Sequence, residues 1–518
     1  NSNIAGTEAI INCHEKLLTS NNIIQMNSLM LDQYQNVQEL ILSKNNLTLI
    51  SSATFIKLKH MKKLDLSDNF LSEMYIDALV ESNNLDELNY SNNKLKVFDN
   101  IIFDKLSTIT KLNLSHNYIE ILKSTIMSTP ITNLIVLDLS HNNITFIDDA
   151  FLKPFVHLQY LNLSFNKITS ISENTFLQLP DLRILMINNN FLSLINFNEL
   201  PQNLTELNIG YNKIIKLLSE PSQIHVANIN FTNISQLEHL HISGNSLSNF
   251  PNMTLRRLKV LDISNNNFSH IPIYLSSENY PSLNTVIVSG NPIKNLTLHS
   301  KLRLQSFVAN NITFVEKINY DTFLKLEAPI NDCINLTISN NEKLIFIDEK
   351  ALDHMNACFV DLSNNKINYI SPKLLLSSNG TLKINNGINL QGNPFACDCS
   401  LQWMLSDLVP QLYVINPSIL NNLRCATPPS LSNKRMVHWY KWKKKIFCDD
   451  IAELSDLSEK YIVHLEGVSE QKVITIESSP GLLAILGSAI LVLIVLFVIG
   501  ILLTQKLEKK RSRKNRRF

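Results

Sequence analysis

One feature constrains the fold of this chain more than any other: a short template that recurs about every 24 residues. Residues 61–71 read MKKLDLSDNFL, residues 85–95 read LDELNYSNNKL and residues 109–119 read ITKLNLSHNYI, and each fits L-x-x-L-x-L-x-x-N-x-L. A period of this length indicates a solenoid with one supersecondary unit per repeat, and we count about fifteen repeats. The template Asn recurs evenly at first and less evenly later, at Asn45, Asn69, Asn93, Asn117, Asn142, Asn166, Asn190, Asn212, Asn245, Asn266, Asn291, Asn310, Asn341, Asn365 and Asn393.

The template has a simple physical reading. L-x-L predicts a short strand whose alternate side chains face opposite sides, so that both Leu positions point into the core. The Asn turns the chain out of the strand and can hydrogen-bond backbone groups that a buried turn leaves unpaired. No repeat buries its apolar face alone, so the stack should fold as one solenoid with a curved parallel sheet on its concave side. A recurring Phe predicts core filling on the convex side, at Phe55, Phe103, Phe151, Phe176 and Phe323.

The repeats resemble the typical extracellular leucine-rich repeats of Toll-type receptor ectodomains and of insect and vertebrate adhesion proteins, over roughly residues 37–395. We expect an α/β solenoid: a curved leucine-rich-repeat horseshoe with a parallel concave sheet, a C-terminal disulfide cap and a single transmembrane helix. We divide the chain into an N-terminal cap region (1–36), repeats (37–393), a C-terminal cap (394–448), an acidic juxtamembrane stalk (449–480), a transmembrane helix (481–504) and a basic cytoplasmic tail (505–518).

The topology rests on residues 481–504, an uncharged run that is long enough to cross roughly 30 Å of hydrocarbon. The following residues, 506–518, contain eight Lys or Arg and one Glu. Positive charge flanks the cytoplasmic end of a span, so we expect a type I plasma-membrane protein with its N-terminus outside the cell. A long buried core helix is the alternative, and the flanking charges argue against it. The first residue is Asn1, so we expect a removed signal peptide or a trimmed chain.

The spacing of the template Asn widens at two places, to 33 residues between Asn212 and Asn245 and to 31 between Asn310 and Asn341. Tolerated drift in loop length is one reading. The other is that these loops carry partner contacts, because function concentrates on loops held by a rigid scaffold.

Four of the seven Cys follow the last repeat. Residues 393–405 read NPFACDCSLQWML, and Cys425 and Cys448 come later. Spacing alone allows three connectivities. The run resembles the C-terminal cap of extracellular leucine-rich repeats, and this resemblance implies the pairs Cys397–Cys425 and Cys399–Cys448. A zinc site is the alternative, which the extracellular context disfavours.

The other three Cys lie within the repeats or before them. Cys333 and Cys358 occupy successive repeats and are candidates for a bridge between them. Cys13 stands alone, where the N-terminal caps of this family usually hold several Cys. An odd Cys indicates a free thiol or an intermolecular bridge, so a homo- or heterodimer is one alternative.

Enzymatic motifs are missing. The sequence contains no H-E-x-x-H, G-x-S-x-G, P-loop or Gly-rich dinucleotide turn, and we predict no enzyme, no catalytic residue, no cofactor and no metal. Lys and Arg number 46 against 45 Asp and Glu, so no overall field favours nucleic acid. His116 and His141 share a template position, which makes them either a pH- or metal-sensitive pair or two ordinary surface residues.

Residues 434–445 interleave Lys and Arg with aromatic residues. Outside the cell this pattern would suit heparan sulphate or an acidic partner. The alternative is that the Trp residues pack in the cap while the Lys residues face solvent or the stalk, which has eight acidic residues against two Lys.

N-x-S/T sequons are dense, and many should carry glycan in a secretory chain. Three of them, Asn89, Asn113 and Asn162, lie at exposed strand positions, where sugars would crowd the early concave face. The acceptor candidates are Asn46, Asn89, Asn113, Asn143, Asn162, Asn203, Asn230, Asn233, Asn252, Asn267, Asn295, Asn311, Asn335 and Asn379.

Less shielded positions follow between residues 158 and 242. Aromatic residues and Arg are enriched in interface hot spots, although the same residues also occur as ordinary repeat filler. The candidate binding residues, which we expect to project from adjacent strands, are Tyr160, Phe165, Arg183, Ile184, Met186, Tyr211, His239 and His241.

Two functions fit these observations. The first is a cell-surface glycoprotein that binds an extracellular protein ligand or another cell, as an adhesion molecule or a co-receptor; we expect no signalling domain in a tail of about 14 residues. The second is an innate-immune receptor, accessory protein or decoy with a Toll-like ectodomain. A membrane-tethered enzyme or enzyme inhibitor is a third class, and the missing motifs count against the enzyme.

Overall fold

The computed structural model divides the chain into two compact units, residues 1–441 and 442–518. It describes residues 9–19, 36–52, 54–55, 58–79, 84–124, 133–218, 234–442 and 445–448. The predicted stalk, membrane span and tail, together with Asn230 and Asn233, lie outside the described residues. Among the described residues, none of the helices combines the length and apolar character needed to cross a bilayer.

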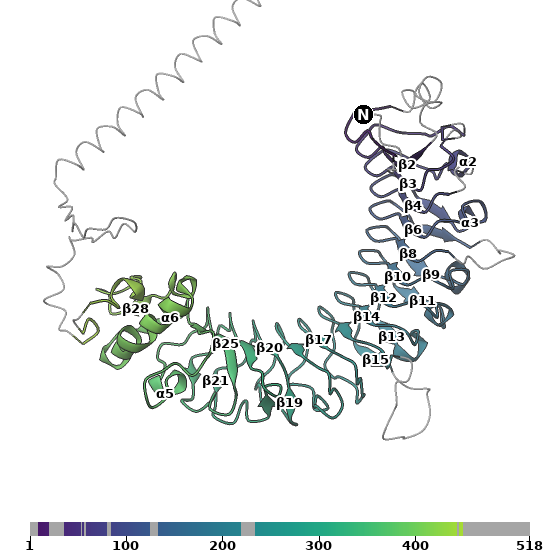
Figure 1. Cartoon of the computed structure of the whole chain (residues 1–518). Helices are drawn as coiled ribbons and strands as arrows, with labels where there is room; N and C mark the ends of the chain where they lie inside the picture. Colours follow the sequence, from purple (N-terminus) through teal and green to yellow (C-terminus); the bar gives the residue numbers. More distant parts are fainter. Residues whose placement is uncertain are drawn as a thin grey trace, which may run out of the picture. The chain divides into compact units, whose positions relative to one another are not determined.

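One parallel sheet organises residues 1–441, and it lines the inner side of a curved stack of turns (Figure 1). Sixteen strands form it in the described part of the chain, so the predicted parallel solenoid is confirmed. In order across the sheet they are β1 (Ala9–Asn12), β2 (Val37–Ile41), β3 (Lys63–Asp65), β4 (Glu87–Asn89), β6 (Lys111–Asn113), β8 (Val136–Asp138), β10 (Tyr160–Asn162), β12 (Ile184–Met186), β14 (Glu206–Asn208), β16 (His239–His241), β17 (Val260–Asp262), β18 (Thr285–Ile287), β20 (Ser306–Val308), β23 (Ile334–Thr337), β25 (Ala357–Asp361) and β26 (Ile388–Asn389).

The outer and lateral sides of the stack carry short pieces of secondary structure. Small two-stranded parallel sheets pair β5 (Val97–Asp99) with β7 (Ile121–Lys123), β9 (Phe146–Ile147) with β11 (Ser170–Ile171), β13 (Leu194–Asn196) with β15 (Lys216–Leu218), β19 (Leu302–Arg303) with β22 (Leu326–Glu327) and β21 (Lys317–Ile318) with β24 (Phe346–Ile347). The helical turns are α2 (Ile76–Leu79), α3 (Ile102–Lys105), α4 (Asp149–Leu152), η2 (Phe176–Gln178), η3 (Phe197–Glu199) and α5 (Pro372–Leu375).

The strands are short because each repeat contributes one L-x-L unit. In β8, β10 and β12 the middle residue is buried and its two neighbours are half-exposed. This alternation follows from the pleat, which sends successive side chains to opposite faces. The core therefore lies behind the sheet, and the residues on either side of each buried Leu form the concave surface.

The template Asn residues form a ladder of buried hydrogen bonds. Asn166 Nδ2 donates to the carbonyls of Leu139 (2.9 Å) and Leu163 (3.1 Å), and Asn166 Oδ1 accepts from the backbone N–H of Ile144 (3.1 Å). One amide thereby joins two successive repeats and satisfies backbone groups that would otherwise be buried without a partner. The buried members are Asn45, Asn69, Asn93, Asn117, Asn142, Asn166, Asn190, Asn212, Asn245, Asn266, Asn291, Asn341, Asn365 and Asn393.

The prediction that Asn310 belongs to the Asn ladder is wrong. The sheet register aligns Phe307 with Val286 and Leu336, which places Ile312 where the template requires Asn. Ile312 is buried, and its N–H donates to Asn341 Oδ1 (2.6 Å). Asn310 Oδ1 instead accepts from the N–H and hydroxyl of Ser339 (2.8 and 3.0 Å). The ladder is interrupted at this repeat, which begins the second irregular spacing.

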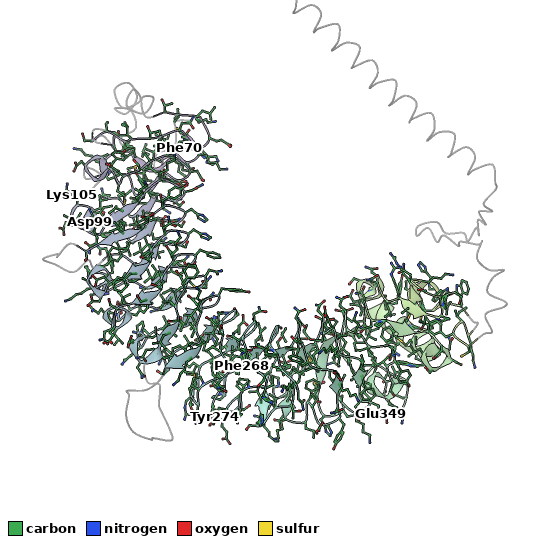
Figure 2. All side chains as sticks on the ribbon, turned by 180° about the vertical axis from the view of Figure 1, so that it is seen from behind. Phe70, Asp99, Lys105, Phe268, Tyr274 and Glu349 are labelled. Atoms are coloured by element: carbon green, nitrogen blue, oxygen red, sulfur yellow. A yellow bond between two sulfur atoms is a disulfide. The ribbon has the colours of Figure 1, made fainter. Side chains whose placement is uncertain are left out.

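The outer side is filled as the recurring Phe predicted. All five of these Phe are buried, and Phe103 packs edge-to-face on Phe155 with ring centroids 5.2 Å apart. Exposed ion pairs join successive repeats on the same side, such as Lys105 with Asp77 (2.8 Å) and Lys373 with Glu349 (3.3 Å). Lys105 and Glu349 point outward in Figure 2. The outer side is thus held by packing within and between repeats.

The C-terminal cap follows the last repeat. It consists of β27 (Phe395–Ala396), η4 (Cys399–Leu401), η5 (Met404–Leu408), α6 (Val409–Ile415), η6 (Pro417–Leu420), β28 (Cys425–Thr427) and η7 (Met436–His438). Strands β27 and β28 pair in parallel, and Cys397 is bonded to Cys425. The buried side chains of Leu401, Met404 and Leu408 cover apolar surface that the last repeat would otherwise expose.

Candidate functional site

The concave surface carries an apolar row over three neighbouring strands. The sheet register places Val136 beside Tyr160, and Tyr160 beside Ile184. Met186 lies two residues along β12, on the same face as Ile184. All four are half-exposed, and neighbouring strands lie about 4.8 Å apart, so these side chains form one continuous strip. We call Val136, Tyr160, Ile184 and Met186 the apolar row.

Charged residues flank the apolar row toward the N-terminus. Glu87 accepts from Lys111 (2.6 Å) and pairs with Lys63 (3.1 Å). The hydrogen bond from Lys111 lowers the pKa of Glu87, burial opposes it, and Lys63 adds to the lowering. A hollow of about 350 Å³ lies here, lined by Glu39, Lys63, Leu64, Asp65, Glu87, Leu88, Asn89, Lys111, Leu112, Asn113, Val136, Asp138 and Tyr160.

Histidine–carboxylate pairs flank the other end of the apolar row. His239 Nδ1 lies 4.0 Å from Glu206, and His241 Nδ1 lies 4.0 Å from Asp262. Burial alone would raise the pKa of Asp262, but contacts with His241 and Ser264 lower it overall. The row therefore ends on both sides in polar groups that already have partners, which is the arrangement of an apolar contact centre with a polar rim.

A stack of rings lies in the turns that follow the strands. His116 and His141 stack with centroids 4.0 Å apart, and His141 stacks on Phe165 at 4.2 Å. All three residues have a left-handed backbone, with φ of 55°, 53° and 54°. His tolerates this conformation better than a bulky residue does, so Phe165 is strained, and 45% of its surface is exposed. We call these three residues the ring ladder.

Tyr211 occupies the same turn position two repeats after Phe165. Its φ is 52°, and 53% of its surface is exposed. The ring lies against Gly244, where a Cβ would come within 2.5 Å of the Tyr211 ring. An exposed aromatic side chain on a strained backbone adds nothing to the core, so these turns are candidates for contact with a partner.

Comparison with known protein families supports the repeat that the sequence and the fold show. Family models described as "Leucine rich repeat" match residues 35–95, 132–192 and 257–277. These segments are leucine-rich repeats.

Two similar proteins extend the comparison. This chain is 26% identical over 249 residues to the CD180 antigen of Mus musculus, covering 45% of this chain and 33% of that protein. The chain thus spans about a third of the length of this curated relative. A leucine-rich-repeat protein of Leptospira interrogans superposes with a TM-score of 0.52 at 24% identity, over 74% of this chain and 90% of that one, a likeness of fold.

A second solved structure is more distant. It is the Toll–Spatzle complex from Drosophila, with a TM-score of 0.40 and 16% identity, over 81% of this chain and 75% of that one.

The repeats bring most of the predicted binding residues together, but not all on strands. Tyr160, Ile184, Met186, His239 and His241 share the concave face of β10, β12 and β16. Phe165 and Tyr211 do not project from strands as expected. They lie in the turns after them, because the template places a left-handed residue just before each ladder Asn.

Arg183 and Val136 complete the comparison with the prediction. Arg183 is exposed just before β12, and its carbonyl accepts from the N–H groups of Thr205 (2.8 Å) and Glu206 (3.0 Å). Val136 was missed by reasoning from the sequence. The signal was present, because Val136 occupies the same template position as Tyr160, one repeat earlier.

The concave strands of the early repeats also carry three acceptor candidates. Asn89, Asn113 and Asn162 are half-buried in β4, β6 and β10, and Asn89 and Asn113 are direct register partners. The hydroxyl of Ser91 donates to Asn89 Oδ1 (2.8 Å), and that of Ser164 to Asn162 Oδ1 (2.7 Å). The exposed candidates elsewhere are Asn46, Asn203, Asn252, Asn267, Asn295, Asn311, Asn335 and Asn379, and Asn143 is half-buried.

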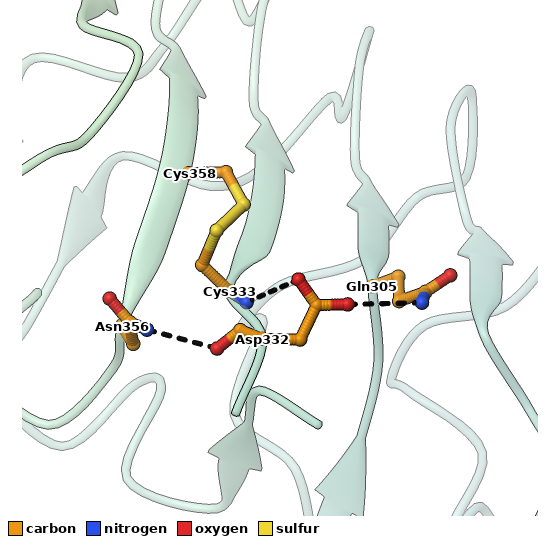
Figure 3. Close-up of a disulfide and its surroundings, with 5 residues drawn as sticks. All are labelled: Gln305, Asp332, Cys333, Asn356 and Cys358. Atoms are coloured by element: carbon orange, nitrogen blue, oxygen red, sulfur yellow. Dashed lines mark hydrogen bonds between the residues drawn. A yellow bond between two sulfur atoms is a disulfide. The ribbon is translucent and has the colours of Figure 1, made fainter. Parts of the chain in front are cut away.

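A disulfide joins the residue just before β23 to β25 in the second irregular repeat (Figure 3). Cys333 is bonded to Cys358, Asp332 Oδ1 accepts from the Cys333 N–H (2.8 Å), and Gln305 Nε2 donates to Asp332 Oδ2 (3.1 Å). Asp332, Cys333 and Cys358 lie close enough to share a metal ion, but both sulfurs are bonded to each other and cannot act as thiolate ligands. The cluster serves as a brace between repeats.

The remaining cysteines differ in whether they form a disulfide. Cys399 and Cys448 are each disulfide-bonded, and their pairing with each other stays a prediction. Cys13 is free and half-buried, and burial raises the pKa of its thiol. A dimer through Cys13 therefore stays a prediction as well.

Proposed function

We propose that this chain is a single-pass type I glycoprotein of the plasma membrane that binds an extracellular protein partner or another cell as an adhesion molecule or a co-receptor. The apolar row carries the proposal. Four half-exposed apolar side chains on three neighbouring strands have no role in the core, and they form the centre of a curved face. Aromatic anchors surrounded by paired polar groups are the usual anatomy of a protein-binding surface.

The position of the site follows from the distribution of acceptor candidates. Glycans at Asn89, Asn113 and Asn162 would crowd β4, β6 and β10, whereas β12, β14, β16, β17, β18 and β20 carry no acceptor sequon. We therefore place the partner over Ile184, Met186 and the strands that follow them, with Tyr160 at the edge of the contact. The uncharged run 481–504 and its basic flank support the membrane anchor.

The second candidate is a receptor, accessory protein or decoy in innate immunity. The similarity to the CD180 antigen favours it. Both candidates use the same binding face, and they differ in what is bound and in which cells carry the protein.

Cells that display the full chain provide the test. Adhesion predicts that displaying cells aggregate with each other or with a second cell type, and that Tyr160→Ala with Ile184→Ser abolishes aggregation. The matched control replaces the exposed Tyr274, which lies on the outer side (Figure 2), together with its exposed neighbour Ile273. Absence of aggregation, with expression confined to immune cells and raised by infection, would favour the immune candidate. Absence of the chain from the cell surface would contradict both.

A further inference from the structure

A cluster of unpaired cations lies on the C-terminal cap, away from the apolar row. The segment 434–441 packs against the rest of the cap through the buried side chains of Met436 and Trp439. Lys434, Arg435 and Lys441 alternate with these anchors and are exposed. The segment therefore points its apolar side chains inward and its charges outward.

Arg424 adds a fourth cation from a neighbouring segment. It is the antiparallel bridge partner of Arg435, so the two residues lie side by side. Arg424 Nη1 donates to the carbonyl of Asn433 (2.6 Å) and Nε donates to Asn422 Oδ1 (2.7 Å). These acceptors are neutral, so they orient the guanidinium without cancelling its charge. Like charges directly opposite each other cost stability, which calls for a compensating anion.

No carboxylate within the described residues supplies that anion. The ion pairs found there include none of Arg424, Lys434, Arg435 and Lys441. Some cations on the repeats, among them Lys63, Lys111 and Lys259, do have an acidic partner. We call Arg424, Lys434 and Arg435, together with Lys441 further along the same segment, the cap cation cluster.

We propose that the cap cation cluster binds a sulfated polysaccharide of the cell surface or matrix. The inference rests on the extracellular location in the proposed function. Guanidinium groups hold sulfate oxygens through paired, charge-assisted hydrogen bonds, and a linear polyanion presents sulfate groups at intervals along its length. Trp439 is buried whereas Trp442 is exposed, so the vesicle measurement below separates this ligand from a lipid surface.

The purified full chain in detergent, with immobilised heparin as the probe, tests this proposal. Lys434→Ser with Arg435→Ser should weaken heparin binding at least about tenfold and should flatten its dependence on salt, because fewer counterions are released. The matched control, Lys167→Ser with Lys366→Ser, removes two exposed cations outside the cap and should change affinity less than about twofold. Arg435→Lys should give an intermediate loss, because it keeps the charge but loses the paired geometry.

Several results would overturn the proposal. Equal losses in the cluster and control variants would mean simple ion exchange. Binding to vesicles with anionic lipid but not to heparin would assign the cluster to a membrane. Heparin binding that appears only after the acidic residues of 449–480 are neutralised would mean that the chain's own acidic segment occupies the cluster.

Two controls keep these results interpretable. Lys441 lies outside the Arg424–Arg435 bridge. If thermal unfolding shows that the double variant does not fold, Lys441→Glu is tested in its place. The assay needs no protein ligand, so a failure to find a partner for the apolar row leaves its outcome unchanged.

Discussion

The imidazole rings of His116 and His141 stack with their centroids 4.0 Å apart and their planes 10° apart. Two charges at this separation repel each other, so the pair resists a second proton. Burial and then the His116 charge lower the pKa of His141, and Asp138 opposes them. The carboxylate of Asp138, in β8, is the charged group that faces His141, and Phe165 covers its other side without a charge.

This arrangement predicts a dependence of stability on pH. The pKa of His141 is lower in the folded chain than its ordinary value of 6.5, so the unfolded chain takes up the proton first. The folded state should lose stability as the pH falls below about 6.5. His116→Asn, which suits the left-handed turn, should raise the pKa of His141. Histidine hydrogen-exchange mass spectrometry on the full chain measures it, and an unchanged pKa would show that the rings titrate independently.

The Asn ladder predicts a large local loss of stability. Asn166→Ala removes the amide that serves Leu139, Leu163 and Ile144, leaving their backbone groups buried without a partner. The free energy of unfolding should fall by about 2–4 kcal/mol. Chemical denaturation measures it, with the exposed Asn249→Ala as the matched control. Equal effects of the two substitutions would contradict the ladder's role.

The turn at Gly244 predicts a steric coupling. Gly244→Ala forces a side chain onto a φ of 66° and against the ring of Tyr211, and should destabilise the chain by about 1–3 kcal/mol. Adding Tyr211→Ala to the same chain should remove the part of this destabilisation that comes from the steric clash. The part that comes from the left-handed backbone should remain. A double-mutant cycle separates the two, and strictly additive effects would mean that Tyr211 moves aside freely.

The disulfide bridge in the second irregular repeat predicts stabilisation by cross-linking. Cys333 and Cys358 are 25 residues apart, so replacing both by Ser should lower the free energy of unfolding by about 3 kcal/mol. Cys13→Ser, which removes a free thiol, is the control and should change little. A thermal unfolding midpoint that is the same in both variants would show that the bridge is dispensable.

The sequence predicts the sheet well because one period controls two properties together. The L-x-L pattern sets which side chains are buried, and the Asn three residues after the second Leu closes the turn. The strands and the concave positions can therefore be located from spacing alone. The prediction for Asn310 failed because an Asn is present in the sequence there, but the sheet register does not place it at the ladder position. Only the alignment of Phe307 with its neighbours reveals that Ile312 takes the ladder position.

The candidate site was less accessible from sequence than the sheet. Tyr160, Ile184 and Met186 could be placed on one face, but Val136 reads as ordinary filler until the register sets it beside Tyr160. Phe165 reads as a strand residue, and only its left-handed backbone turns it toward His141. The cap cation cluster depends on an antiparallel β-bridge between Arg424 and Arg435, which no local sequence pattern predicts.

The central claim is that the apolar row is the binding centre, and one affinity measurement tests it most directly. A partner captured by cells that display the full chain would be titrated against the unaltered chain, against Tyr160→Ala with Ile184→Ser, and against the control Tyr274→Ala with Ile273→Ser. We predict a loss of affinity of about tenfold to a hundredfold or more for the first pair and almost none for the control. Unchanged affinity in the first pair, with the fold intact, would contradict the assignment.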